Sequence, residues 1–311
     1  SGATFSALTF HHESRNLPRD LPSPVTSVPP EASLPPEKPT RQRSNLATRV
    51  ITSVVVAPLI LLLLYFGPAW GFYLLIFAAS GIGAHELFQM THPADRISRL
   101  VGVVFALATS ATFWFFSDNA LALLALFAAL PIAALLLALA RLGDIQTAAL
   151  RISATAFGPL WIGLLTLLAL LRRDQGDAGP GYVVMTLMFA WLADTGGYFA
   201  GRFFGKHKLY EAVSPKKTVE GFAGALTGAL TGALLAHFWY LPTIPLLHAL
   251  GLALLAGALG QLGDLGESLM KRSTGVKDSG GIVPGHGGLL DRVDALLVTS
   301  AIVYFYTRFA A

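Results

Sequence analysis

Apolar segments of helical length follow one another along the 311-residue chain from residue 46 onward. A helix of about 20 residues crosses the roughly 30 Å hydrocarbon core of a bilayer. The pattern predicts nine such helices, over 46–66, 69–90, 98–116, 119–141, 151–171, 182–204, 219–240, 243–267 and 290–309. We therefore expect an all-α polytopic membrane protein.

Composition supports this class and removes several others. Only 13% of the residues are charged and 54% are hydrophobic, whereas a soluble domain carries about 25% charged residues. The absence of cysteine excludes disulfides, a thiolate nucleophile and a cysteine-ligated metal. A net charge of +4 would raise nucleic-acid binding in a soluble protein, but in a membrane protein the placement of charge matters more. We expect membrane lipids, and no nucleic acid, as partners.

The N-terminal segment 1–45 differs from the rest of the chain. It holds eight of the 18 prolines, with serine, threonine and charged residues between them. Such a segment has too little apolar surface to offset the entropy lost on ordering. We expect a disordered, proline-rich tail.

Basic residues predict the orientation of the helices, because lysine and arginine in short loops favour the cytoplasmic side. With the N-terminus inside, all but Arg172, Arg173 and Arg308 of the 22 lysines and arginines are cytoplasmic. Nine helices then place the C-terminus outside. We expect a multi-pass protein of the cell membrane in this N-in, C-out orientation.

Glycines recur at four-residue spacing in two of the predicted helices. One series is Gly197, Gly201 and Gly205, and the other is Gly224, Gly228 and Gly232. Small residues at this spacing let helices approach closely in lipid. We interpret both series as packing surfaces.

Acidic residues inside membrane helices are costly, by about 2.5 to 3.5 kcal/mol at a helix centre, and are therefore functional candidates. Four qualify, namely Glu86, Asp194, Asp264 and Glu267. All four fall in the cytoplasmic half or edge of their helices. The alternative for Asp194 and Asp264 is a proton relay.

Helical spacing indicates which polar residues lie together near Asp264. Asp264, Glu267, Ser268 and Lys271 follow at i, i+3, i+4 and i+7, which places them on one helix face. The pair Asp291 and Asp294 repeats the i, i+3 spacing at the start of the last helix. Carboxylates that converge from separate helices form a hard-oxygen site suited to Mg²⁺.

Two glycine-rich basic loops flank this face and offer the lysines and backbone N–H groups that phosphate oxygens need. Their candidate phosphate-binding residues are Lys206, Lys208, Ser214, Lys217, Lys277, Asp278, His286, Gly287, Gly288 and Arg292. Taken alone, each residue has a plainer interpretation. The lysines would only satisfy the positive-inside rule, His286 would be structural, and Arg292 with Asp294 would form a solvated ion pair. Their joint occurrence on one side of the membrane favours the phosphate site.

The stretch from Ser268 to Asp294, with Lys271-Arg272 and Gly287-Gly288 inside it, resembles the C-terminal signature of phosphatidate cytidylyltransferases, also called CDP-diacylglycerol synthases. Ala193 to Lys208 and Ser214 to Thr218 are similar to other cytoplasmic motifs of that family. The resemblance runs from about Arg49 and is strongest over 190–295. It leaves the tail without a counterpart.

The resemblance implies that CTP and phosphatidic acid give CDP-diacylglycerol and pyrophosphate at the cytoplasmic face. It also implies a divalent cation, with K⁺ as a second ion, and a homodimer. On this basis we expect residues 46–180 to pack and anchor, and residues 181–311 to form the catalytic region.

The roles we assign within the catalytic region follow from charge. Asp264 and Asp291 are the expected primary metal ligands, and Asp294 and Asp194 are weaker candidates. Lys217, Lys271 and Arg272 neutralise substrate phosphates, and Ser268 donates a hydrogen bond.

Two other classes of protein compete with this interpretation. An ion- or proton-coupled transporter would also carry intramembrane aspartates, but no internal repeat is evident. A CDP-alcohol phosphotransferase would carry an Asp-Gly-x-x-Ala-Arg motif, which is missing from the sequence.

Overall fold

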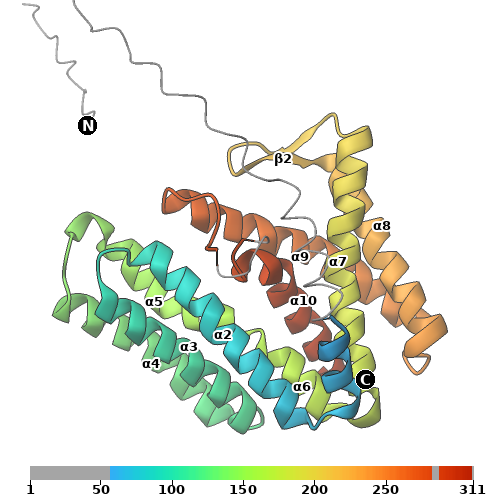
Figure 1. Ribbon diagram of the computed structural model, residues 1–311, viewed down its shortest axis with the longest axis horizontal. Helices are drawn as coiled ribbons and strands as arrows, with labels where there is room; N and C mark the ends of the chain where they lie inside the picture. The colour runs from blue at the N-terminus through green and yellow to red at the C-terminus, as the bar shows by residue number, and fades with distance from the viewer. Residues whose placement is uncertain (1–56, 282–286, 310–311) are drawn as a thin grey trace, which may run out of the picture. The chain divides into compact units, whose positions relative to one another are not determined.

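The computed structural model describes residues 57–281 and 287–309. The predicted tail over 1–45 lies outside the described residues, as does most of the first predicted helix. The remainder is almost entirely helical, which confirms the all-α class (Figure 1). Its helices are α2 (Ala69–Thr91), α3 (Arg96–Phe116), α4 (Ala120–Ala140), α5 (Ala148–Gly163), α6 (Thr166–Asp174), α7 (Gly179–Phe204), α8 (Val219–Leu235), α9 (Leu246–Ser273) and α10 (Leu290–Phe309).

Seven segments of the described chain are long and apolar enough to cross a membrane. They are α2, α3, α4, the segment Ile145–Asp174, the segment Gly176–Phe204, the segment Val219–Tyr240 and α9. A shorter apolar helix spans Ala57–Phe66. Helix α10 has 20 residues but begins with Asp291, Arg292 and Asp294. The multi-pass membrane class is confirmed, while the number nine and the orientation stay predictions.

The segment predicted as one helix over 151–171 is instead two helices. Helix α5 ends at Gly163 and α6 begins at Thr166. At the break, the N–H groups of Leu164 and Leu165 bond three residues back, to Trp161 and Ile162. Tighter i to i+3 bonding of this kind is common where a helix ends. Gly163 also allows a close approach, because a Cβ there would lie 2.7 Å from Thr109 Cγ2.

Helices α7 and α8 lie side by side along their length (Figure 1). A Cβ on Gly228 would lie 2.0 Å from the Leu192 carbonyl oxygen, and one on Gly196 would lie 2.3 Å from the Gly224 carbonyl oxygen. The backbones therefore touch, as small residues permit in lipid. The predicted packing role of the series Gly224, Gly228 and Gly232 on α8 is confirmed within the chain, and Gly196 on α7, which the prediction did not include, meets this series.

Helices α2 to α6 pack among themselves, and α4 lies at their edge. Only Leu130 and Ala134 of α4 are buried, although its sequence is almost entirely apolar. An apolar face of this extent would be unfavourable in water, so it suits contact with lipid.

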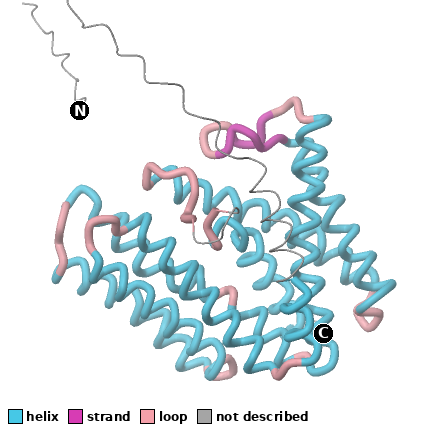
Figure 2. The backbone as a smooth tube through the Cα atoms, in the orientation of Figure 1, coloured by secondary structure: helices cyan, strands magenta, loops and turns pink. Residues whose placement is uncertain are grey.

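The basic segment between α7 and α8 is a β-hairpin, where the sequence had suggested an irregular loop. Strand β1 (Lys208–Tyr210) pairs antiparallel with β2 (Ser214–Thr218), as Figure 2 shows. At the end of β2, the Thr218 hydroxyl accepts a hydrogen bond from Gly221 N and caps α8. The hairpin thus leads Lys217 directly to the start of a membrane helix.

Candidate active site

A cavity of about 560 Å³ opens where the hairpin meets α7, α8 and α9. It is lined by both acidic and basic side chains, together with glycines of α7 and α8. The charged and polar ones are Asp194, Arg202, Lys216, Lys217, Gln261 and Asp264. A cavity of this size and polarity can take a small charged ligand.

Lys217, on strand β2, contacts helix α9 at the wall of this cavity. Its Nζ lies 2.7 Å from Asp264 Oδ2 and 3.2 Å from Gln261 Oε1, both on α9. Gln261 Nε2 in turn donates to Asp194 Oδ1 on α7 at 3.2 Å. The predicted residues Asp194, Lys217 and Asp264 are therefore brought together at one cavity wall.

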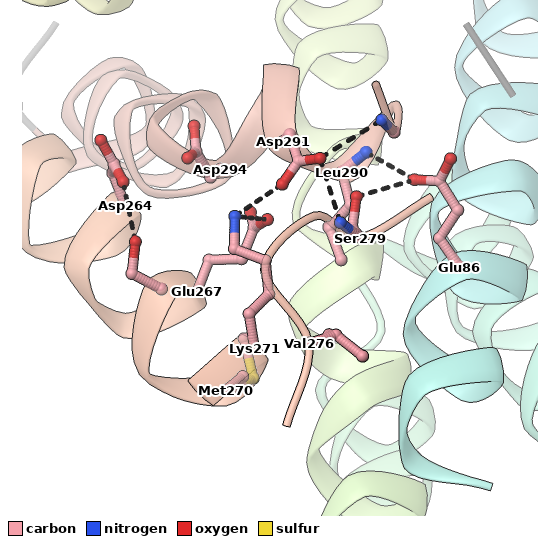
Figure 3. Close-up of polar contacts among 12 residues, drawn as sticks. Glu86, Asp264, Glu267, Met270, Lys271, Val276, Ser279, Leu290, Asp291 and Asp294 are labelled. Carbon is pink, nitrogen blue, oxygen red and sulfur yellow. Dashed lines mark hydrogen bonds and ion pairs between the residues drawn. The ribbon is translucent and has the colours of Figure 1, made fainter. Parts of the chain in front are cut away.

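A second lysine–carboxylate cluster lies between α9 and α10 (Figure 3). Lys271 Nζ lies 2.5 Å from Asp291 Oδ1 and 3.1 Å from Glu267 Oε1. Glu267 is fully buried, and its Oε2 has no hydrogen-bond partner among the described residues. The i, i+4 pairing of Glu267 with Lys271 is the one that the helical spacing predicts.

The other oxygen of Asp291 is held by backbone. Asp291 Oδ2 accepts hydrogen bonds from Ser279 N at 3.1 Å and Gly288 N at 3.2 Å. Gly287 beside it has φ +83°, a left-handed conformation that favours glycine. Backbone N–H groups of the glycine-rich loop thus bind a carboxylate of the protein itself.

Asp294 lies near both clusters. It is 8% exposed and lies within electrostatic range of Asp194, Asp264 and Glu267. Figure 3 shows Asp264 on α9 and Asp294 on α10 at neighbouring positions of the two helices. Ser268, one turn after Asp264, has its Oγ 3.5 Å from Asp264 Oδ1.

Other predicted substrate residues lie at the edge of this site. The side chains of Lys206 and Lys208 are exposed on the hairpin side, and Ser214 pairs with Tyr210 in the strands. Exposed residues on the α9 and α10 side complete the set, namely Arg272, Lys277, Asp278 and Arg292. His286 lies outside the described residues. The edge residues stay predictions as phosphate ligands.

Sequence reasoning missed Gln261, which contacts both Lys217 and Asp194. An amide three residues before Asp264 in an apolar helix is a detectable signal, because polar groups in membrane helices pair with one another. It also left Glu86 without a role, although the acid stands at the end of a membrane helix.

The described carboxylates of the two clusters fit Mg²⁺ in their chemistry, although they are not arranged as a formed metal site. Within residues 57–281 and 287–309, no three acidic or histidine side chains already converge on a common point, and Asp264 and Asp291 each pair with a lysine. The chemistry of the donors nevertheless fits a cation, because five carboxylates lie in the two clusters, namely Asp194, Asp264, Glu267, Asp291 and Asp294. Carboxylate oxygens are also the ligands that Mg²⁺ prefers.

Helices of membrane-spanning length surround a polar cavity that has lysines and carboxylates at its wall, which is typical of a membrane protein with a site for a charged ligand. Residues 47–310 match the model of the cytidylyltransferase family. The chain belongs to this family. Because the chain belongs to this family, it is an enzyme and not the transporter that the sequence had left as an alternative.

Relatives that carry a name agree with this membership. The chain is 33% identical to the phosphatidate cytidylyltransferase of Bacillus subtilis over 266 residues, which cover 84% of the chain and 97% of that protein. It is 44% identical to the phosphatidate cytidylyltransferase of Staphylococcus saprophyticus over 124 residues, which cover 40% of the chain and 48% of that relative. The relative from Staphylococcus aureus strain COL, with the same name, is 43% identical over 124 residues.

Proposed function

We propose that the protein converts CTP and phosphatidic acid to CDP-diacylglycerol and pyrophosphate. The observation that carries the proposal is the cavity of about 560 Å³ among membrane helices, lined by both Asp264 and Lys217. A nucleotide that reacts with a lipid needs a polar site at membrane depth, and irregular backbone is acceptable there because it lines a wet cavity. The names of the relatives supply the substrates.

The reaction needs no protein nucleophile. A phosphate oxygen of phosphatidic acid attacks the α-phosphorus of CTP, and the bond from this phosphorus to the oxygen bridging to the β-phosphate breaks. Pyrophosphate leaves with the electron pair of that bond. Charge is spread over the transferring group, so positioning and electrostatic stabilisation supply most of the catalysis.

The residues of the chain divide these tasks. Lys217 would exchange its contact with Asp264 for a phosphate oxygen of CTP, since both side chains line the cavity. Lys271 and Arg272 would neutralise further phosphate charge, and Ser268 would donate a hydrogen bond. The exposed residues of the cavity edge would guide the two anionic substrates by their net positive charge.

Mg²⁺ would be held by Asp264 and Asp291, with Asp294 and Asp194 as additional ligands or as residues that orient them. The cation would neutralise charge on the CTP phosphates when bound. K⁺ as a second ion rests on the family resemblance.

The decisive experiment supplies purified protein with radiolabelled CTP and phosphatidic acid in mixed micelles, with and without Mg²⁺. We expect labelled CDP-diacylglycerol only when the metal is present. Labelled product without any divalent cation would overturn the metal assignment, and its absence under every condition would overturn the proposed reaction.

We also propose that the site faces the cytoplasm of the cell membrane. Because the chain has no cysteine, single cysteines can report the side of each loop. An impermeant thiol reagent applied to intact cells should label Asp177→Cys, between α6 and α7, and should spare Tyr210→Cys in the hairpin. The opposite labelling would reverse the orientation.

The homodimer implied by the resemblance is proposed as well. The glycines of α7 and α8 are used within the chain, so a dimer contact would use another surface. Light scattering of the detergent-solubilised protein should give twice the chain mass of 33.0 kDa. A protein mass equal to one chain would contradict the dimer.

A further inference from the structure

Glu86 reaches from α2 to the start of α10. Its carboxylate is fully buried and accepts hydrogen bonds from Leu289 N at 3.0 Å and Leu290 N at 2.9 Å. The Ser279 hydroxyl donates to the same carboxylate at 3.3 Å. Figure 3 shows Glu86 on α2, opposite the loop that carries Ser279 and the first turn of α10.

These contacts cap a helix from a different part of the chain. The first N–H groups of a helix have no partner within it, and its N-terminus carries a partial positive charge. Helix α10 begins at Leu290. Glu86 supplies the oxygen acceptors and the negative charge that this end requires.

The backbone is shaped closely around the Glu86 carboxylate. A Cβ on Gly288 would lie 2.8 Å from Glu86 Oε2, and one on Gly280 would lie 2.9 Å from Glu86 Oε1. Both distances are too short for a side chain. A side chain at either glycine would therefore displace the Glu86 carboxylate from its present position.

The same loop holds Asp291. Ser279 donates its hydroxyl to Glu86 and its backbone N–H to Asp291 Oδ2, and Gly288 N donates to the same Asp291 oxygen. Asp291 Oδ1 then pairs with Lys271. Through Ser279, Glu86 is connected to Asp291, a predicted metal ligand, and through Asp291 to Lys271, a predicted phosphate ligand.

We propose that Glu86 is a positioning residue, which holds the start of α10 and the 279–281 segment so that Asp291 and Lys271 keep their places. The proposal rests on the proposed function, since Asp291 and Lys271 are assigned there. It gives helix α2, which the sequence assigned to packing and anchoring, a part in the site.

The test compares Glu86→Gln with Ser80→Ala. Both change a buried polar side chain of α2, but Ser80 Oγ has no hydrogen-bond partner among the described residues. Glutamine keeps the size of the side chain and offers only one oxygen. We expect Glu86→Gln to lower kcat at least about tenfold, because misplacement of catalytic groups by about 1 Å can cost about 100-fold. KM for CTP should stay within about threefold of the unchanged protein if binding of the ground state is preserved.

A spectroscopic measurement separates positioning from general stability. A nitroxide on Gly281→Cys has space, since nothing lies within 4 Å of a Cβ there, and the chain has no other cysteine. The spectrum should show greater mobility with Glu86→Gln and no change with Ser80→Ala. Glu86→Asp, which keeps the charge, should recover part of the lost kcat.

Three results would overturn the proposal. They are a kcat of Glu86→Gln per folded molecule equal to that of the unchanged protein, a lowered kcat with an unchanged nitroxide spectrum, and an equal loss of kcat in Ser80→Ala. Failure of the proposed function is distinguishable, because then the unchanged protein makes no CDP-diacylglycerol while the nitroxide spectra still respond to Glu86→Gln.

Discussion

Two lysine–aspartate pairs of similar length occupy different surroundings. Lys217 and Asp264 are 2.7 Å apart, and their side chains are 18% and 25% exposed at the cavity wall. Lys271 and Asp291 are 2.5 Å apart, with a buried glutamate on one side and backbone N–H groups on the other. The first pair lies open to the cavity, whereas the second is also held in place by contacts within the fold.

The difference shows that pairing alone does not define a role. A partly exposed ion pair contributes little to stability because water competes for both charges. A buried pair strongly destabilises the protein when one partner is removed, since the other charge is left uncompensated. The cavity pair should therefore affect activity alone, and the enclosed pair should affect activity and stability together.

The largest effect expected is loss of turnover in Asp264→Asn and in Asp291→Asn. Each change keeps the shape and removes a charge, and loss of one electrostatic contact to a transition state costs about 100-fold or more in kcat. The loss of turnover is measured as the rate of CDP-diacylglycerol synthesis from labelled CTP. Near-normal activity of both variants would refute their assignment as metal ligands. Thermal unfolding in detergent micelles should separate them, with Asp291→Asn alone less stable.

The next largest effect is a loss of stability that should differ between variants of Lys271 and Lys217. Lys271→Met leaves Glu267 and Asp291 without their cation and should lower the free energy of unfolding by about 3 kcal/mol. Lys217→Met should change it by less than about 1 kcal/mol. Equilibrium unfolding in detergent micelles measures both values. Equal losses would mean that the two pairs do not differ in the way proposed.

A third effect concerns the helix contact behind the cavity pair. Gly228→Ala would place a Cβ 2.0 Å from the Leu192 carbonyl oxygen, and overpacking of this kind costs about 1 to 3 kcal/mol. Gly251→Ala is the matched control in α9, because nothing lies within 4 Å of its Cβ. The control should be as stable as the unchanged protein or more so. A destabilised control would show that any added methyl is harmful.

The smallest effect lies away from both pairs, in the link 92–95 between α2 and α3. Burial and, secondarily, the charge of Arg151 lower the pKa of His92 to about 4, from its usual value of about 6.5. At a pH between about 4 and about 6.5, His92 binds a proton in the unfolded chain but not in the folded chain, so stability falls as the pH falls. His92→Gln should show a shallower decrease of unfolding temperature from about pH 6.5 to pH 4. Equal slopes of unfolding temperature against pH in His92→Gln and in the unchanged protein would contradict the lowered pKa of His92.

Helix positions could be read closely from the sequence, because apolar periodicity and length are local properties. The prediction 69–90 became α2 over Ala69–Thr91, and 290–309 became α10. The hairpin was not foreseen, since its lysine- and proline-containing strands lack an alternating pattern. The break after Gly163 was also missed, because it depends on bonding within the turn and on contact with Thr109.

The sequence by itself determined the membrane class, the acidic stripe of α9 and the contact of Glu267 with Lys271, because these follow from transfer of side chains to lipid and from helical spacing. Only the tertiary structure decided that Lys217 meets Asp264 and that Glu86 meets Leu290, 204 residues away. Such pairings depend on how helices pack. Local spacing carries no information about them, so neither lysine–aspartate pair could be predicted from the sequence.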